Sequence, residues 1–404
     1  MRAERAWQLR QELVGELVRE GRVRSARVEA VLRAVPREVF VPGVPLEEVY
    51  RPSDAIVVKR LEGVSVSSAS APDVMAVMLE QLAVEPGQRV LEIGAGTGYN
   101  AALLAELVGP DGEVVSVEID EDLVLAAREH LRTAGYERVQ VVLGDGALGY
   151  AAAAPFDRVI LTVGAGDIVP AWRDQLRHPG GRLVLPLAIS GSQRCVAFEH
   201  LGDHLASRAI LNCSFIPLRG LLAGSTPRLP LGPNGEMAIS SSSLHLSAGA
   251  VSELLRGPHR SLTTGVLAST AEVAEGLVLW LAARERAMCS VWASSSPGLS
   301  EAVPELFSSP GKWRASLGLL NDGGLALLAW ARGNPPAEGT RDDLVVRVFG
   351  TPGDTLLERV QAWQAAGRPL DTALTIRAYP HDHPASGEAV LEQRWTRFVL
   401  DWNA

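Results

Sequence analysis

Between residues 89 and 187, short runs of valine, isoleucine and leucine alternate with segments of helical pattern. The runs span 89–93, 113–117, 139–143, 156–161 and 181–187, and helices are predicted between them at 98–108, 121–135 and about 168–177. Strands that alternate with helices are typical of a parallel sheet covered on both faces. Two further runs, 194–200 and 207–218, have only a turn between them and predict an antiparallel finish. The fold class is therefore α/β, doubly wound.

The chain has 404 residues, which favours two domains. Amphipathic patterns in residues 1–40 predict two helices at the start of the first domain, which we place at 1–220. Residues 221–240 are rich in glycine, proline and serine and are predicted to form a linker. Residues 241–404 mix strand and helix patterns, so we expect a C-terminal α+β domain there, with substrate recognition as its role.

Charge and hydropathy exclude two classes of partner. The formal net charge is −9, whereas a protein that binds nucleic acid through phosphate contacts needs a basic face. No uncharged apolar run reaches about 18 residues, so no membrane span is expected. The N-terminal segment lacks the apolar core of a signal peptide, and the expected location is the cytoplasm.

Neither the cysteines nor the histidines predict a metal site. The three cysteines lie far apart, without a CxxC pair, and indicate reduced, packed thiols: Cys195, Cys213 and Cys289. Two histidine pairs have metal-like spacing, but the first flanks a turn and the second lies in a proline-flanked loop: His200 with His204, and His381 with His383. No metal is expected.

A glycine-rich loop, "VLEIGAGTGYNAALLA", follows the first strand of the alternating region. Gly94, Gly96 and Gly98 leave the backbone open to a ligand, and the helix that follows offers free N–H groups. Dinucleotide folds usually have GxGxxG, where the helix start holds a pyrophosphate. Here the spacing is GxGxG, and Glu92 precedes it. A carboxylate there would repel a pyrophosphate but would suit a ligand with an amino group.

Two more acids end the next two strands. Glu118 lies about 20 residues past the loop, where a carboxylate can hold a ribose diol, and Asp145 in "GDG" could accept a hydrogen bond from an adenine amino group. Taken alone, either acid could be a solvated loop residue. Together with the loop they predict a site for S-adenosylmethionine, and they disfavour a nicotinamide dehydrogenase.

At this point the sequence resembles the protein-L-isoaspartate O-methyltransferases. The match runs from "VPREVFVP" (35–42) through "SASAPDVMAVMLEQL", the glycine loop and "GDGALGYAAAAPFDRVILTVGA" to "LRHPGGRLVLPL", which is about half the chain. The resemblance implies a mostly parallel, seven-stranded Rossmann-like methyltransferase sheet. It also implies that the segment around Ser67, Ser68 and Ser70 lies over the cofactor and the substrate carboxylate, with Ser70 as the active-site serine. The implied cofactor positions are Glu92, Gly94, Gly96, Glu118, Asp145 and Gly146.

Three departures from the family concern the substrate. Asp73 stands where the family usually has histidine, Asp167 lies near the expected substrate mouth, and "IPLRG", which contains Arg219, leads into an added domain. We expect Asp73, Asp167 and Arg219 to contact the substrate. The layout resembles the enlarged relatives found beside ribosomally made, post-translationally modified peptides, including the lanthipeptide-associated FxLD-type methyltransferases.

Residues 65–82, "SVSSASAPDVMAVMLEQL", change at a proline from small polar residues to a helical pattern. If Pro72 opens the helix, Ala71 takes the capping position and Ser70 is free to donate to a substrate carboxylate. The alternative is that Ser70 is itself the N-cap and nothing more.

The predicted function is S-adenosylmethionine-dependent methylation of an Asp side-chain carboxylate in a ribosomally made peptide, whose ester collapses to succinimide and isoaspartate. One rival function is repair of L-isoaspartyl residues in damaged proteins. Another is a non-catalytic module that keeps the cofactor pocket.

Overall fold

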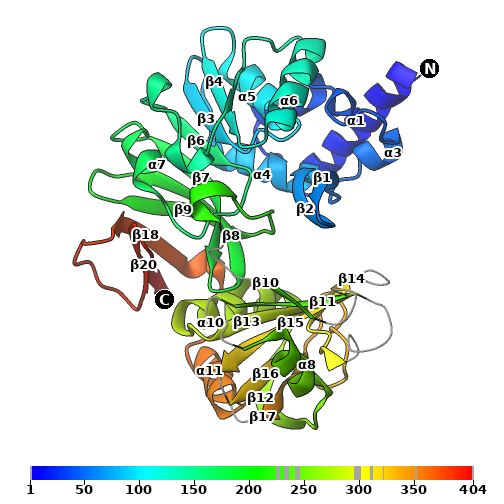
Figure 1. The fold of residues 1–404 in the computed structure, drawn as a ribbon, viewed down its shortest axis with the longest axis vertical. Coiled ribbons are helices and arrows are strands. Elements are labelled where there is room, and N and C mark those ends of the chain that lie inside the picture. The colour runs from blue at the N-terminus through cyan, green and yellow to red at the C-terminus, as the bar shows by residue number, and fades with distance from the viewer. Residues whose placement is uncertain are drawn as a thin grey trace.

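A computed structural model describes residues 2–223, 228–231, 236–241, 246–294, 302–309, 313–321, 323–350 and 353–402. Figure 1 shows two lobes stacked along the long axis, each built around its own sheet. Both ends of the described chain, residues 2 and 402, belong to the first lobe. In the part of the chain that the structure describes, no helix combines the length and the apolar character needed to cross a membrane.

The first lobe contains the predicted parallel strands, in the order β5-β4-β3-β6-β7. Their bounds confirm the sequence pattern to within one or two residues: β3 (Arg89–Ile93), β4 (Glu113–Glu118), β5 (Gln140–Leu143), β6 (Arg158–Leu161) and β7 (Arg182–Ile189). The connecting helices are α4 (Pro72–Leu82), α5 (Tyr99–Val108), α6 (Glu121–Ala134) and α7 (Pro170–Asp174). Successive residues of each strand face opposite sides, so Val90 packs in the core on one face of the sheet and Leu91 in the core on the other.

The antiparallel finish is confirmed, and the sheet then continues in an unexpected way. β8 (Ser192–His200) pairs with β7, and β9 (Leu205–Asn212) pairs with β8. The sheet next takes in three strands from the end of the chain: β18 (Leu374–Pro380), β20 (Thr396–Trp402) and β19 (Ala389–Glu392). The sheet therefore has ten strands rather than seven, and beyond β7 all of its pairings are antiparallel.

The second lobe is an antiparallel sheet in the order β10-β11-β13-β15-β16-β17-β12, with β14 beside β15. Its strands are β10 (Arg228–Leu231), β11 (Met237–Ser241), β12 (Arg260–Ala268), β13 (Met288–Ser294), β14 (Phe307–Ser309), β15 (Trp313–Asn321), β16 (Gly324–Trp330) and β17 (Asp342–Gly350). Its helical segments are α8 (Ala248–Arg256), α9 (Thr270–Glu272), the π-helical η5 (Val273–Leu277), α10 (Val278–Arg284) and α11 (Gly353–Ala365), and η7 (Asp371–Ala373) leads back to the first lobe.

These strands correct two of the expected domain boundaries. The predicted linker at 221–240 contains β10 and β11, and its residues 224–227 and 232–235 lie outside the described part of the chain. The predicted C-terminal domain at 241–404 gives up residues 374–402 to the first sheet. Two hydrophobic clusters account for these differences. Buried side chains of β10 and β11 belong to the core of the second lobe, whereas those of β18 and β20 share a cluster with β3, α10 and α11. The second lobe is thus a long insertion between β9 and β18.

The N-terminal region adds α1 (Arg2–Arg19), α2 (Ala26–Ala34), the 3-10 turn η1 (Arg37–Val39) and α3 (Leu46–Val49). Ser25 caps α2 by accepting a hydrogen bond from the Val28 N–H. A hairpin of β1 (Ile56–Leu61) and β2 (Val64–Ala69) was not predicted. Its turn is Glu62-Gly63, where both residues have positive φ, which is the geometry of a two-residue hairpin loop.

Candidate functional site

A cavity of about 1200 Å³ opens at the carboxyl ends of β3 and β4. The β1–β2 hairpin and the residues that follow it form one wall, and residues 214–219 form another. β10 and β11 of the second lobe close a third side, through Pro230, Met237 and Ala238. The site is thus built from both lobes.

The glycine loop forms the floor of this cavity. Gly94 has φ +97°, and a Cβ there would lie 2.8 Å from the Thr162 hydroxyl oxygen, so only glycine fits. Gly96 also lines the cavity. Gly98 does not line it; it is the N-cap of α5, and a Cβ there would lie 3.2 Å from the Ala127 carbonyl oxygen of α6. Gly98 therefore sets the approach of two helices.

Glu118 is the last residue of β4, and its carboxylate lines the cavity. One carboxylate oxygen accepts from the Gly96 N–H at 2.9 Å, and the other accepts from the Ile119 N–H at 2.9 Å and from the Asp120 N–H at 3.2 Å. These bonds fix the carboxylate beside the loop. A fixed carboxylate at this strand end suits the ribose diol of a nucleoside.

Glu92 differs from the expectation. It lies behind the loop with 0% of its surface exposed and is absent from the cavity wall. Its two carboxylate oxygens accept from the Asn100 side-chain amide at 2.7 Å and from the Ser116 hydroxyl at 2.5 Å. The predicted direct contact with a cofactor amino group is therefore corrected: Glu92 ties β3 to α5 and β4 beneath the loop.

Burial raises the pKa of Glu92 from 4.5 to about 7, outweighing its two hydrogen bonds. The folded state thus favours the protonated carboxyl, and its stability falls as pH rises through the window from 4.5 to about 7. We expect the unfolding midpoint of the wild type to drop between about pH 5 and pH 8, and to drop less in Glu92→Gln. Thermal melts across that range measure the difference, with Glu113→Gln at the exposed start of β4 as the control. If the unfolding midpoint falls with pH as steeply in Glu92→Gln as in the wild type, Glu92 does not have the raised pKa of a buried carboxyl.

Asp145 and Gly146 are also placed differently from one another. Gly146 lines the cavity, and a Cβ there would lie 2.3 Å from an Ile93 methyl carbon. The carboxylate of Asp145 instead caps η2 (Gly146–Leu148) through the Ala147 N–H at 2.9 Å, and it accepts from the Leu221 N–H at 2.7 Å. Asp145 therefore anchors the 214–222 segment. It does not line the cavity, so its predicted contact with the adenine of the cofactor is corrected.

The three predicted serines line the cavity. Ala71 is the N-cap of α4 without a side-chain cap bond, and Pro72 is the first helical residue, so the alternative in which Ser70 caps the helix is wrong. Within the described residues the Ser70 hydroxyl has no hydrogen-bond partner. Ser67 lies close to the loop, with its hydroxyl oxygen 3.6 Å from where a Cβ on Gly96 would be.

Arg37 positions this serine segment, and our sequence analysis missed its role. Its side chain is buried, and it donates to the Ser70 carbonyl at 2.8 Å and to the Val49 carbonyl at 3.0 Å. Desolvation lowers the pKa of the guanidinium. Arg37 lies in "VPREVFVP", the first stretch of the family resemblance, and this position could have marked it as a residue of the site.

Two of the predicted substrate residues hold other parts of the chain. Asp73 accepts from the Val74 N–H at 2.6 Å and from the Ser53 hydroxyl at 2.9 Å, so it ties the start of α4 to the loop before β1. Asp167 is 4% exposed and accepts from the Ile168 and Trp395 N–H groups, at 2.8 and 2.9 Å. Neither lines the cofactor cavity. Asp167 therefore anchors the returning C-terminal strands, which is a correction to its expected place at the substrate mouth.

Removing the Asp167 carboxylate is expected to cost stability rather than activity. Asp167→Ala leaves the buried Ile168 N–H and the partly buried Trp395 N–H without an acceptor, which costs about 2 kcal/mol of unfolding free energy. Urea unfolding measures this loss, and Asp174→Ala, at an exposed position of α7, serves as the control. A rise in the KM of the methyl acceptor at unchanged stability would restore the substrate role.

Arg219 does line the cavity, but an acid holds it there. It forms a two-pronged pair with Asp120, at 3.1 and 2.5 Å. Lys59 of β1 pairs with the same Asp120 at 3.0 Å and with Asp122 at 2.6 Å. Asp120 thus joins the hairpin to the 214–222 segment. No pattern in the sequence pointed to Lys59 or Asp120.

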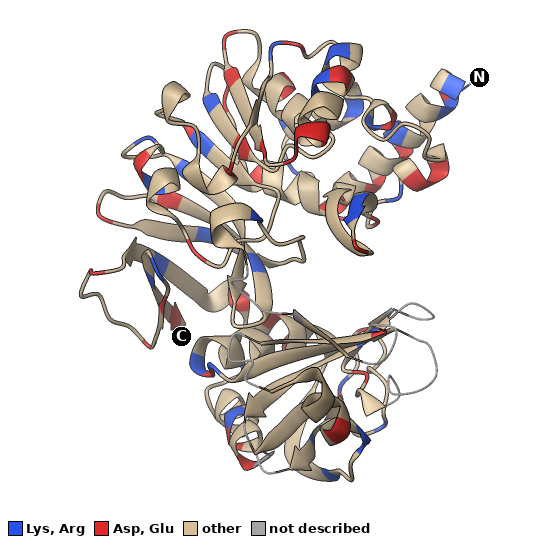
Figure 2. Cartoon of the chain, in the orientation of Figure 1, with Lys and Arg blue, Asp and Glu red and all other residues tan. Residues whose placement is uncertain are grey.

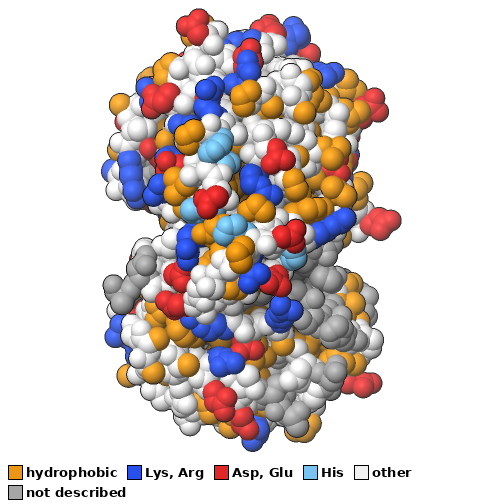
Figure 3. All heavy atoms as spheres, turned by 90° about the vertical axis from the view of Figure 1, so that its left-hand side faces the viewer, with side chains coloured by type: hydrophobic (Ala, Val, Ile, Leu, Met, Phe, Trp, Pro, Cys, Tyr) orange, Lys and Arg blue, Asp and Glu red, His pale blue; other side chains and the backbone are white. Residues whose placement is uncertain are grey.

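Charged residues and histidines also occur outside this cavity. Figure 2 shows acidic and basic residues interspersed over both lobes. Among the described residues, no group of three or more His, Cys, Asp and Glu side chains is placed to hold a metal ion. Figure 3 shows histidines gathered near the waist of the molecule. His204 stacks on Tyr379, and Tyr379 stacks on His383.

Comparison with known proteins gives one consistent result. The family described as protein-L-isoaspartate(D-aspartate) O-methyltransferase matches residues 8–223. The enzyme of that name from Methanopyrus kandleri is 39% identical over 213 residues, which covers 52% of this chain and 91% of the relative. The one from Methanothrix thermoacetophila is 42% identical over 196 residues, which covers 48% of this chain and 89% of the relative.

A solved structure titled protein-L-isoaspartate O-methyltransferase has a TM-score of 0.52 and 24% identity, and the alignment covers 91% of this chain and 96% of that one. It shows a shared α/β methyltransferase fold. The cavity fits the family's cofactor, because an open glycine loop and a fixed carboxylate at a strand end meet there. The chain belongs to the protein-L-isoaspartate O-methyltransferase family and is an S-adenosylmethionine-dependent carboxyl methyltransferase.

Proposed function

We propose that the chain methylates a carboxylate of an aspartyl-derived residue in a polypeptide, with the L-isoaspartyl residue of a damaged protein as its substrate. The observation that carries this proposal is the Ser70 hydroxyl, which lines the cofactor cavity without a protein partner within the described residues. The names of the relatives, whose length the chain covers almost completely, support the choice of isoaspartate.

The chemistry asks little of the protein beyond alignment. A carboxylate near pH 7 is already ionised, so no general base is needed. When bound, S-adenosylmethionine supplies an activated methyl group. Glu118 and the Gly94–Gly98 loop hold the cofactor, and Ser70 donates a hydrogen bond that orients the substrate carboxylate. The hairpin and the 214–222 segment, both paired with Asp120, keep water out.

A second candidate is methylation of a chosen Asp side chain in a ribosomally made modified peptide, as in the lanthipeptide-associated FxLD type. The next residue's amide nitrogen then attacks the ester carbonyl, methanol leaves, and the succinimide hydrolyses to isoaspartate. What favours this candidate is that Pro230, Met237 and Ala238 of the second lobe line the cofactor cavity. In both cases we place substrate selection in the second lobe. The three free cysteines support a reducing compartment such as the cytoplasm.

Mass spectrometry separates the two candidates. The protein is incubated with S-adenosylmethionine and an isoaspartyl peptide, its aspartyl twin, or an aspartate-containing precursor of a modified peptide. Repair predicts a gain of about 14 Da on the isoaspartyl peptide alone. Tailoring predicts the same gain on an Asp of the precursor, followed by methanol loss to a net change of about −18 Da. If no peptide gains a methyl group, both candidates fail.

A further inference from the structure

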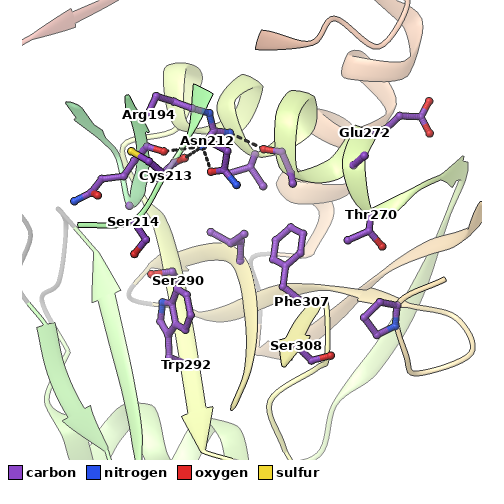
Figure 4. Close-up of a pocket in the computed structure, with 18 of the residues that line it drawn as sticks. Arg194, Asn212, Cys213, Ser214, Thr270, Glu272, Ser290, Trp292, Phe307 and Ser308 are labelled. Carbon is purple, nitrogen blue, oxygen red and sulfur yellow. Dashed lines mark hydrogen bonds between the residues drawn. The ribbon is translucent and has the colours of Figure 1, made fainter. Parts of the chain in front are cut away.

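A second cavity, of about 1690 Å³, lies between the two lobes. Residues of β8 and the segment after β9 form its upper wall (Figure 4). Residues of α9, β13, β14, β15 and the 335–341 segment line much of the remainder. Ser214, Phe215 and Pro217 line both this cavity and the cofactor cavity. The 214–217 segment therefore separates the two cavities and forms a wall of each.

The size of this space argues for a large ligand. Small-molecule sites typically have volumes of about 300–1,000 Å³, and the interlobe cavity is larger. The polypeptide around the methylated residue must continue away from the reacting atoms. A neighbouring cavity that shares a wall with the reaction site is a suitable place for that continuation.

Apart from the exposed Glu338, the charged groups in the wall are already paired within the protein. Arg194 donates to the Asn212 side chain at 2.9 Å and lies 3.8 Å from the Asp371 carboxylate. Glu272 pairs with Arg341 at 2.6 Å. Such pairs leave little charge to attract an ionic ligand.

The rest of the wall offers uncharged hydrogen-bonding groups. Several hydroxyl side chains line it, and they come from both lobes: Ser192, Ser214, Thr270, Ser290 and Ser308. The Thr270 hydroxyl oxygen is buried without a protein partner within the described residues. Uncharged donors and acceptors of this kind suit the amide groups of a polypeptide backbone.

An aromatic slot completes the wall. Trp292 of β13 keeps 39% of its surface exposed, packs against Trp313 with ring centroids 5.1 Å apart, and lines the cavity together with Phe307. Figure 4 shows the Trp292 and Phe307 rings directed into the same space as Ser290 and Ser308. A tryptophan left exposed in a concave wall is a common anchor for an apolar side chain of a partner.

The wall shared with the cofactor cavity, the uncharged hydroxyl groups and the aromatic slot point to one ligand. We infer that the interlobe cavity binds the polypeptide that flanks the methyl-acceptor residue. This polypeptide is an uncharged segment that places a large apolar side chain at Trp292 and Phe307. The inference rests on the proposed function, because it takes a polypeptide as the substrate. It makes Trp292 a specificity-determining residue and leaves the methyl-transfer chemistry to the cofactor cavity.

The experiment compares two isoaspartyl peptides that share the same centre. One has about six residues; the other adds about eight uncharged residues with one leucine or phenylalanine, roughly 26 Å of extended chain. We expect the long peptide to have a KM about tenfold lower at equal kcat, and Trp292→Ala to remove that advantage. The short peptide is expected to react equally with both proteins. Trp7→Ala, at a 55% exposed tryptophan of α1, is the matched control and is expected to behave like the wild type.

A binding measurement keeps the inference separate from the proposed function. Fluorescence anisotropy of the labelled long peptide is read with S-adenosylhomocysteine present, so turnover is not needed. If neither isoaspartyl peptide is methylated, the proposed substrate is wrong, yet weaker binding to Trp292→Ala still supports the cavity as a polypeptide site. A long peptide whose KM and anisotropy are the same in wild type and Trp292→Ala overturns the inference. Loss of a dimer in Trp292→Ala by sedimentation, without an effect of peptide length, would also overturn it, since the cavity would then seat a second copy.

Discussion

Ser70→Ala is expected to lower kcat/KM for the methyl acceptor about 100-fold, the usual effect of losing a donor to the reacting group. The hydroxyl lines the cofactor cavity, while the Ser70 carbonyl, held by Arg37, remains in the variant. The affinity for S-adenosylhomocysteine should therefore stay within about twofold of the wild type, as read by titration calorimetry.

The control for this variant is Ser261→Ala, at an exposed position of β12 in the second lobe. It removes the same hydroxyl at a place remote from the cavity and is expected to leave kcat/KM unchanged. If Ser70→Ala turns over like Ser261→Ala, the substrate carboxylate is oriented by other groups. Weakened cofactor binding alone would instead assign Ser70 to the cofactor.

The second large effect is expected at Glu118. Glu118→Ala removes the carboxylate that we assign to the ribose and also frees the Gly96 N–H, so cofactor affinity should fall at least about 100-fold. Calorimetry with S-adenosylhomocysteine measures the loss. Glu113→Ala, at the opposite end of the same strand, is the control, and thermal melts show whether both variants fold. An affinity that falls less than about threefold would place the ribose elsewhere.

Local patterns predicted the elements of the first lobe well. Each parallel strand contains a Val/Ile/Leu run, largely buried except in the edge strand β5. Pro72 marked the start of α4 because proline fits the first helical position. The β1–β2 hairpin was missed because its second strand, "VSVSSA", is half serine and has only two residues that favour a strand, Val64 and Val66. The short turn at Glu62-Gly63 could have indicated a hairpin, but only if the residues on both sides of it were already taken as paired strands.

The acids show where sequence reasoning about the site succeeded and where it failed. Glu118 is the last residue of its strand and projects past the sheet into the cavity. Glu92 lies one residue before the end of β3, and strand alternation turns it away from the face of Leu91 and Ile93. The alternation is visible in the sequence, so this correction could have been made there. The partner of Asp167 could not have been found in this way, because Trp395 lies 228 residues away and no local pattern encodes that contact.

The way the chain leaves and re-enters the first sheet limits how the molecule can flex. One connection runs from β9 towards β10, and another returns from α11 to β18. Two chain connections resist rotation of the second lobe more than a single connection would, and the hydrophobic cluster shared by β3, α10 and α11 resists it further. The aromatic slot is therefore held in place relative to the cofactor cavity, and a long peptide would meet it in the same alignment at each turnover.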